Sequence, residues 1–404
     1  MNMNNKNWVS VWGNAVSIAE HHPEAYAKYI TLRYPVYIPF DGDTLRFTFD
    51  NFCGSEAVTV TRATVSAATS PVYAKRKRSA TSLYEKMPLA CPCKKETICD
   101  ITFSKNESVT MEAHQTAVSD PVSFPVKKGM TLTVSLYFAD FTLMQSAVLV
   151  TGPLSKGFFS LGDQTHTDAL PMDTTKTTNW FYFLSNIELM TAEENHTVIC
   201  YGDSITAGAW PDYLTLLARQ NPDNHTAFIR RATSGSRVLR QYECITYDSY
   251  GLKGTNRFPH EIPTTGADTV IIQQGINDII HPIGIETNPF RPMSDLPTAK
   301  ELIDGYRYYI EEAKKLHLKV YMGTLLPIFG WRTYATFRDD LRNELNAWIR
   351  SAKEIDGCID FDLALRGSEN PSAFREGFDS GDHLHPSSKA YQAMAECAYE
   401  VLRK

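Results

Sequence analysis

Four short segments in the second half of the sequence carry side chains that can act together in acyl transfer. The first contains Ser204, which stands in Gly-Asp-Ser between the apolar residues 197–201 and a helix-like segment. A serine on a strand-to-helix turn presents its hydroxyl to the crevice at the carboxyl end of a sheet, beside helix N–H groups. That position suits a nucleophile, although Asp203 or Ser204 could equally be a simple helix cap.

Two further turns follow strand-like segments and offer hydrogen-bond donors. Residues 226–231 lead into Ala-Thr-Ser-Gly235, and residues 269–273 lead into Gln-Gly-Ile-Asn277. Because the carboxyl ends of parallel strands meet at one edge of a sheet, the Gly235 amide and the Asn277 side chain can both point at a spot near Ser204. Donors gathered in this way stabilise an oxyanion. Each residue also has a simpler interpretation, Gly235 as a turn glycine and Asn277 as a helix cap.

The fourth segment precedes the last helix-like stretch and reads Gly-Asp382-His383-Leu-His385-Pro. Asp382 lies three residues before His385, so its carboxylate can accept a hydrogen bond from Nδ1–H and leave Nε2 free to take the serine proton. His385 is therefore the predicted general base. His383 creates a His-x-His pair that invites a zinc site, but further ligands at recognised spacings are lacking nearby, and we predict no bound metal.

The elements that must position these segments alternate between strand and helix after about residue 195. Strand-like residues 197–201, 226–231, 269–273, 319–325 and 358–363 are interleaved with helix-like residues 212–219, 298–317, 333–352 and 387–402. This order predicts a three-layer α/β/α domain of the flavodoxin-like type, with a mostly parallel sheet.

The first half of the chain is predicted to be a β-sandwich of the jelly-roll type. Residues 44–49, 57–65 and 131–137 either alternate in polarity or are rich in Val and Thr, with turn signals between them. The polar, aperiodic residues 192–196 place the boundary there. The expected domains are a sandwich over residues 1–194 and an α/β domain over residues 195–404.

Residues 73–99 interrupt the strand pattern and are predicted to form a long exposed loop. They contain the basic run 75–78 and three cysteines, Cys91, Cys93 and Cys99. Three thiols within nine residues could bind zinc, although no fourth ligand is evident. Reduced, buried thiols are the simpler interpretation for the eight cysteines as a whole.

Composition excludes several classes of protein. The 404 residues carry 40 Lys and Arg against 46 Asp and Glu, a formal net charge of −6, so there is no basic field for a nucleic acid partner. The apolar runs fall far short of the roughly 18 residues of a membrane span. The N-terminal residues show no basic and apolar leader, which predicts a cytoplasmic protein, or a secreted one whose signal has been removed.

Taken together, the four segments resemble the SGNH, or GDSL, hydrolase superfamily, whose blocks carry a serine, a glycine, an asparagine and a histidine in this order. The resemblance implies a serine ester hydrolase with Ser204 as nucleophile and Asp382 and His385 as the rest of the triad. Its oxyanion donors would be the Ser204 amide, Gly235 and Asn277.

The resemblance has one departure and one extension. The family often has Asn ahead of the glycine in the second block, where this chain has Arg230 and Arg231. A weaker similarity, to bacterial members with an N-terminal β-sandwich, continues upstream through Trp8 and residues 13–15, 31–33, 50–54, 119–121 and 180–184.

The mechanism that the resemblance implies proceeds through an acyl-serine and needs no metal or organic cofactor. The glycine-rich motifs that bind phosphate groups are also absent from the sequence.

Three hypotheses remain open for the substrate. One is a short acyl, above all acetyl, ester of a carbohydrate, with Trp210, Trp331 and Tyr334 lining the sugar site, because residues 248–260, 281–297 and 328–338 are polar or rich in proline. Another is a lipase or lysophospholipase that acts on longer acyl chains. The third, from a different class, is a glycan-binding protein on a degenerate hydrolase.

Overall fold

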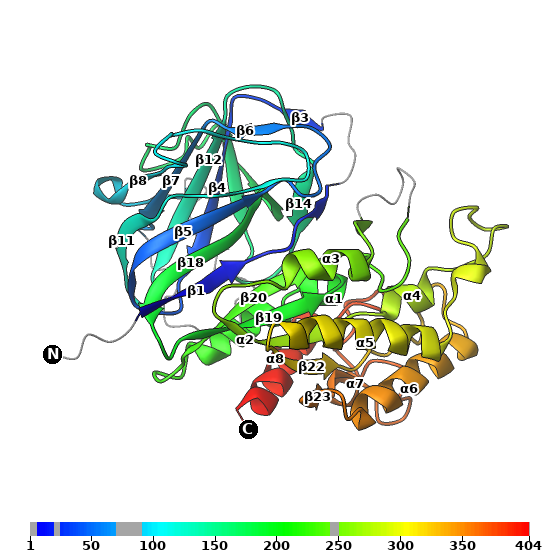
Figure 1. The fold of residues 1–404 in the computed structure, drawn as a ribbon. Helices are drawn as coiled ribbons and strands as arrows, with labels where there is room; N and C mark the ends of the chain where they lie inside the picture. The colour runs from blue at the N-terminus through cyan, green and yellow to red at the C-terminus, as the bar shows by residue number, and fades with distance from the viewer. Residues whose placement is uncertain (1–5, 20–24, 70–90, 243–249, 404) are drawn as a thin grey trace. The chain divides into compact units, whose positions relative to one another are not determined.

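The computed structural model describes residues 6–19, 25–69, 91–242 and 250–403, which divide into two compact units (Figure 1). Unit 1 consists of Met1–Thr197 with Pro222–Ile229, and unit 2 consists of Val198–Asn221 with Arg230–Lys404. The basic run at residues 75–78, residue 248 and Cys244 lie outside the described residues.

Unit 1 is built on two larger antiparallel sheets. One has the order β1 (Lys6–Gly13), β18 (Leu184–Ala192), β5 (Gly42–Asp50) and β10 (Thr116–Val118), with β11 (Val122–Val126) also paired to β5. The other has the order β16 (Lys176–Thr178), β15 (Gly157–Leu161), β4 (Ile30–Tyr37), β12 (Thr131–Phe138), β7 (Arg62–Ala67) and β8 (Cys99–Ile101). The short strands are β2 (Ser17–Ile18), β3 (Tyr26–Ala27), β6 (Val58–Val60), β9 (Val109–Met111), β13 (Thr142–Leu143), β14 (Ser146–Leu149) and β17 (Trp180–Tyr182).

The core of unit 1 lies between these two sheets. Leu45, Phe47 and Phe49 of β5 are fully buried, whereas the residues between them are half-buried, as expected of a strand with one face on a core. Phe138, at the end of β12, packs against Phe183, the residue before β18 of the other sheet, with ring centroids 5.4 Å apart. Two antiparallel sheets joined by interdigitating apolar side chains form a sandwich.

Unit 2 is a parallel α/β arrangement in three layers. Its sheet has the order β20 (Thr226–Ala232), β19 (His196–Gly202), β21 (Ala267–Gln273), β22 (Lys319–Gly323) and β23 (Gly357–Ile359). One group of packed helices is α2 (Trp210–Ala218), α7 (Phe361–Leu365) and α8 (Ser388–Leu402), and the other is α3 (Gly254–Glu261), α5 (Ala299–Lys315) and α6 (Thr336–Ser351).

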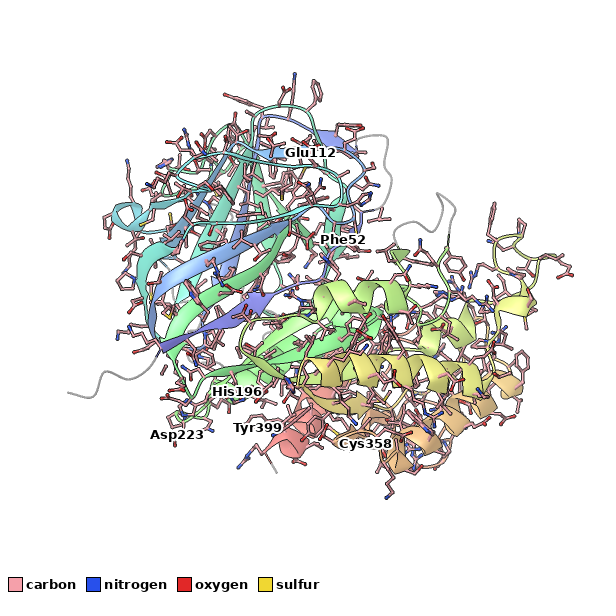
Figure 2. All side chains as sticks on the ribbon, in the orientation of Figure 1. Phe52, Glu112, His196, Asp223, Cys358 and Tyr399 are labelled. Atoms are coloured by element: carbon pink, nitrogen blue, oxygen red, sulfur yellow. The ribbon has the colours of Figure 1, made fainter. Side chains whose placement is uncertain are left out.

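The predicted fold class, a sandwich followed by an α/β/α domain, is confirmed. α8 packs against the edge strand β23, and Figure 2 labels Tyr399 and Cys358 on these two elements. None of the helices in the described ranges combines the length and apolarity that crossing a membrane requires.

Some predicted elements differ from those observed. Residues 57–65 are two strands, β6 and β7, and the predicted strand 358–363 ends at Ile359 because Asp360 starts α7 by accepting a hydrogen bond from the Leu363 N–H (3.1 Å). Two short helices were not predicted: α3, and α4 (Ile276–Ile280), which follows the end of β21.

The prediction of an exposed loop is wrong for residues 91–99. Cys91 and Cys93 are buried, and Cys99 begins β8. The segment is fastened to the sandwich by backbone hydrogen bonds, including Cys93 N–H to Asp168 O (2.7 Å), and by Arg33, which donates to the Cys91 carbonyl (3.3 Å). Burial raises the pKa of the Cys91 thiol to about 12, which disfavours the thiolate that zinc requires.

Candidate active site

Three of the predicted residues meet at the carboxyl edge of the unit 2 sheet. Ser204 is the first residue of α1 (Ser204–Ala207), directly after β19, and His385 lies in the loop before α8. The His385 Nε2 is 2.9 Å from Ser204 Oγ, and the His385 Nδ1 is 2.6 Å from Asp382 Oδ2. Residues 181 positions apart in sequence thus form one continuous hydrogen-bonded chain from carboxylate to hydroxyl.

The Asp382 carboxylate is held in place by its own loop. Its Oδ1 accepts hydrogen bonds from the backbone N–H groups of Leu384 (3.0 Å) and His385 (2.8 Å). Partial burial raises its pKa, but the hydrogen bonds from the His385 ring and from these two N–H groups outweigh that effect and lower the pKa to about 2. The carboxylate therefore stays ionised at neutral pH, where it can orient the imidazole and stabilise its protonated form.

Gly235 and Asn277 lie at the ends of the strands on either side of β19. Gly235 has φ +76°, and a Cβ atom there would lie 2.1 Å from Cδ1 of Tyr250, so both conformation and space require glycine. Asn277, on α4, is buried and donates one amide hydrogen to the Ser236 carbonyl (3.0 Å). That bond fixes the orientation of the amide and leaves its second hydrogen for another acceptor.

The turns that carry these residues are braced by buried arginines whose roles were missing from the sequence predictions. Arg257 of α3 donates to the Gly202 carbonyl (2.8 Å), to Thr233 Oγ1 (3.2 Å) and to Ser236 Oγ (3.3 Å), which ties the ends of β19 and β20 together. Its charge is balanced by Glu261 at 2.7 Å. A helical Arg and Glu four residues apart was the available signal, but it is equally common on solvated helix surfaces.

Arg230 and Arg231, which stand where the family often has Asn, have a similar structural role. Arg230 is buried and pairs with Asp212 (2.8 Å) while donating to the Gly208 carbonyl (3.1 Å), and Arg231 donates to the Glu261 carbonyl (3.1 Å). Both contacts anchor β20 to neighbouring helices. The second block is therefore braced by ion pairs and carbonyl contacts of these two arginines.

Asp203 lies directly beside the serine and is fully buried. One of its oxygens accepts a hydrogen bond from the Ile205 N–H (3.0 Å) and caps α1, whereas Oδ2 has no hydrogen-bond partner among the described residues. Burial raises the pKa of this carboxyl to about 7, against an ordinary value of 3.8.

We expect Asp203→Asn to flatten the pH dependence of the unfolding free energy between about pH 4 and 7. Between these values the folded chain holds a proton on Asp203 that the unfolded chain releases, so the group lowers stability as pH rises and has no further effect above its folded pKa. Urea titrations across this range measure the slope, with Glu369→Gln, an exposed carboxylate of unit 2, as control. An Asp203→Asn slope equal to that of the native chain would contradict the assignment.

The three aromatic residues predicted to line a sugar site lie in different environments. Trp210 is completely buried at the start of α2, where it packs on Phe361 (5.5 Å between centroids) and donates to Thr206 Oγ1 (3.3 Å), so it cannot line a substrate site, and that prediction is wrong. Its apolar ring completes the core between α2 and α7. Trp331 and Tyr334 are half-buried on the loop before α6, and only Tyr334 lines the pocket there. Phe258, in a segment predicted to overhang the crevice, is buried in α3.

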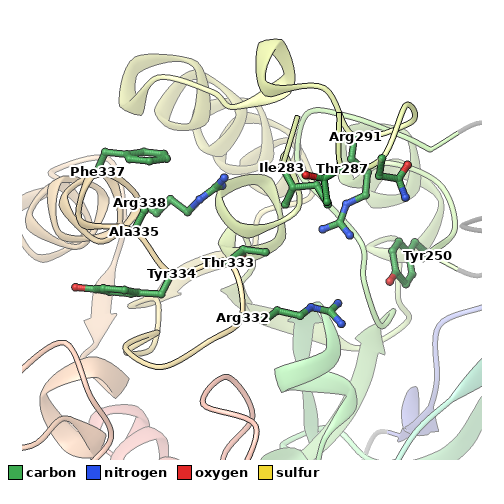
Figure 3. A pocket seen from close by; sticks show the side chains of 11 residues that line it. Tyr250, Ile283, Thr287, Arg291, Arg332, Thr333, Tyr334, Ala335, Phe337 and Arg338 are labelled. Atoms are coloured by element: carbon green, nitrogen blue, oxygen red, sulfur yellow. The ribbon is translucent and has the colours of Figure 1, made fainter. Parts of the chain in front are cut away.

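A pocket of about 820 Å³ opens beside these turns (Figure 3). Its wall includes Tyr250, which lies against Gly235, and Thr333, whose hydroxyl donates to the carbonyl of Ile280 (2.8 Å) at the end of the Asn277 helix. These two contacts place the pocket beside the elements that carry Gly235 and Asn277, although neither of these residues nor any member of the triad is among its described lining residues. Across the described ranges, no group of three or more His, Cys, Asp and Glu side chains is arranged to hold a metal.

A hydrogen-bonded serine, histidine and aspartate at the carboxyl edge of a parallel sheet is the arrangement of an α/β serine hydrolase. Comparison with family models agrees: residues 200–393 match the GDSL-like lipase/acylhydrolase family. Residues 200–393 therefore form an ester hydrolase domain of the SGNH type, as the four sequence blocks predicted.

Solved structures similar to this chain come from several bacteria. They include a GDSL-like lipase from Bacteroides thetaiotaomicron (20% identity, 52% of this chain and 89% of that one, TM-score 0.38). A member of the lipolytic G-D-S-L family from Veillonella parvula has 17% identity over 52% of this chain and 99% of its own, with a TM-score of 0.35. An acetyl xylan esterase from Geobacillus stearothermophilus has 16% identity over 52% and 96%, with a TM-score of 0.37. No curated protein matches the chain.

Proposed function

We propose that this hydrolase removes acetyl groups from carbohydrate esters, with Ser204, His385 and Asp382 as its catalytic triad. The observation that carries the catalytic part is the hydrogen-bonded chain from Asp382 through His385 to Ser204, with distances of 2.6 and 2.9 Å. Both distances lie within the range at which a proton passes directly between heavy atoms.

The reaction follows from these contacts. His385 Nε2 takes the Ser204 proton as Oγ attacks the ester carbonyl, and Asp382 stabilises the imidazolium that forms. The negative charge on the carbonyl oxygen is held by the Ser204 and Gly235 backbone amides and by the free hydrogen of the Asn277 amide. The imidazolium then protonates the leaving alcohol, and water attacks the acyl-serine by the same route to release the acid.

Asn277→Ala is expected to lower kcat about 10²- to 10³-fold, because one preorganised donor to the oxyanion is lost. The same substitution removes the bond to the Ser236 carbonyl, so the unfolding midpoint must be measured alongside the kinetics. Asn343→Ala, on the exposed face of α6, is the control. A loss of kcat below about tenfold would reduce Asn277 to a structural cap.

The polarity of the pocket supports a carbohydrate as the alcohol part of the ester. Its wall carries three Arg, two Thr, two Tyr and an Asn, against Ile283, Ala335 and Phe337 as its only aliphatic or phenyl side chains. Hydroxyl, amide and guanidinium groups can hydrogen-bond sugar hydroxyls, and the two tyrosine rings offer faces for stacking.

One observation favours the second candidate, an esterase for longer acyl chains. Ile285 and Phe290, on the loop after α4, and Phe337, in the first turn of α6, are exposed, with 61%, 55% and 48% of their surface accessible. These side chains are apolar exceptions within segments 281–297 and 328–338, which were predicted to be polar or rich in proline. An apolar rim of this kind could receive an alkyl chain.

A series of p-nitrophenyl esters from acetyl to dodecanoyl separates the two candidates. If an acyl groove exists, each buried methylene contributes about 0.8 kcal/mol and kcat/KM rises about fourfold per methylene. We expect instead that kcat/KM is highest for acetyl and falls by butanoyl or hexanoyl. A steady rise to octanoyl would establish the longer-chain esterase.

A further inference from the structure

The pocket beside the turns that carry Gly235 and Asn277 is positively charged, in contrast to the chain as a whole. The protein as a whole carries a net charge of −6, yet the described residues of the pocket wall include Arg291, Arg332 and Arg338 and no Asp or Glu. Glu286, on the same loop as Arg291, is exposed and outside the wall. Three guanidinium groups on one wall create a local positive potential.

The three arginines are not equivalent. Arg338 is buried and donates to the carbonyls of Ile279 and Pro282, which fixes the loop after α4. Arg291 is also buried and is anchored through Nε to the carbonyl of His281 (2.6 Å). Arg332 is exposed and rests on the Trp331 ring, with its guanidinium carbon 4.7 Å from the ring centre. Figure 3 shows the guanidinium groups of Arg291 and Arg332 directed toward the same part of the pocket, beside Tyr250.

A further buried arginine, Arg237, lies behind this wall and is linked to it by stacked rings. Tyr250 stacks on His281 (5.2 Å, 18°), His281 lies against Tyr242 (5.7 Å), and the Arg237 guanidinium lies over the Tyr242 ring (4.8 Å). Arg237 is 2% exposed, and its Nε and Nη2 have no hydrogen-bond acceptor within the described part of the chain. Its Nη1 forms a long ion pair with Asp295 (3.9 Å), which is shared with Arg240, and its charge also opposes the rise that burial causes in the pKa of Asp278.

The pKa of His281 is affected by the same positive charges. Burial, and then the charges of Arg291, Arg237 and Arg332, hold its pKa well below the usual range. The imidazole is therefore neutral at pH 7, and the positive potential comes from the guanidinium groups. A buried cation with open donors is costly unless an anion approaches it.

We propose that Arg291 and Arg332 bind a carboxylate or sulfate on the sugar, so that the natural substrate is an acetylated acidic saccharide. The proposal rests on the esterase function above and specifies its substrate class. An acetyl group fills only a small part of about 820 Å³, so the space next to the arginines remains for the sugar and its anionic group. Guanidinium groups match the geometry of both anions with paired N–H donors.

Binding of simple sugars tests the anion site without requiring turnover. The probes are glucuronate, glucose 6-sulfate and glucose, followed by NMR titration of the full chain. We expect one of the two anions to bind at least about tenfold more tightly than glucose, since hydrogen bonds to charged groups are strong. The tighter of the two identifies the natural anion.

Variants connect that preference to the pocket. Arg332→Gln is expected to reduce the preference for the anion over glucose by about tenfold or more, Arg332→Lys to retain part of it, and Arg403→Gln, in the last turn of the chain, to leave it unchanged. Equal binding of glucose and both anions would overturn the proposal. So would a preference that survives in full in Arg332→Gln.

Turnover separates this proposal from the function on which it rests. The substrates are acetylated methyl glucuronoside and acetylated methyl glucoside, and the acidic ester should have the higher kcat/KM, with an advantage that shrinks as salt is added. Equal turnover of both esters keeps the esterase function and overturns the acidic substrate. Tight binding of glucuronate with no cleavage of any ester overturns the esterase function, and with it the acidic substrate.

Discussion

Ser204→Ala is expected to lower kcat on p-nitrophenyl acetate by about 10⁴- to 10⁶-fold, the loss typical of removing a nucleophile from a serine triad. The substitution deletes the only atom of Ser204 that contacts His385 Nε2. It leaves the backbone of α1 capped by Asp203, so the fold should be retained. Circular dichroism and the unfolding midpoint check that expectation.

A fluorophosphonate probe provides an independent readout, because it labels only serines activated by a neighbouring base. One label is expected on the native chain, at Ser204, and none on the alanine variant. Ser351→Ala, at the end of α6, is the matched control, since its hydroxyl donates to the Ala347 carbonyl (2.9 Å) within its own helix. Labelling of a different serine, or activity retained in Ser204→Ala, would show that Ser204 is not the nucleophile.

The positions of Ser204, Gly235, Asn277 and His385 were predictable because each follows from local sequence. A polar residue just after an apolar strand of a parallel sheet is placed at one edge by topology alone. Three such turns, at Ser204, Gly235 and Asn277, together with the Asp382–His385 segment before the last helix, therefore indicated which residues form the candidate site. The strand bounds moved by only a residue or two at β19, β20 and β21.

The residues that the sequence could not place are those whose environment depends on distant parts of the chain. Trp210 follows the serine turn closely, and nothing in its neighbours indicates that Phe361 covers it. Arg257 stands in a polar segment for which no helix was predicted, yet it is 2% exposed and donates hydrogen bonds at the ends of two strands. Buried charges and buried tryptophans are exceptions to composition rules, so only the tertiary contacts identify them.

The charge of the pocket was missed for the same reason. Arg291 lies in residues 281–297 together with Glu286 and Asp295, and Arg332 lies in residues 328–338, so the charges of the two segments nearly cancel in a chain whose net charge is −6. The fold turns the arginines into the pocket and leaves Glu286 outside it. Which charges converge is a property of loop conformation, which residue types alone do not determine.

The second large effect is expected from His385→Ala, with His383→Ala as its internal control. Both histidines have an aspartate on Nδ1, at 2.6 Å from Asp382 for His385 and 2.5 Å from Asp379 for His383. The two dyads are therefore alike in type of partner and in distance. Only His385 has its Nε2 within reach of Ser204, so it alone can take the proton.

We expect His385→Ala to lose about 10⁴- to 10⁶-fold in kcat and His383→Ala to stay within about threefold of the native chain. His383 has φ +65°, a conformation that asparagine adopts more readily than alanine, so His383→Asn separates a folding defect from a catalytic one. Both His383 variants inactive and folded, with His385→Ala active, would assign the base to the other dyad. Because the dyads differ chiefly in what Nε2 reaches, the comparison isolates the contact with Ser204 as the cause of the catalytic loss.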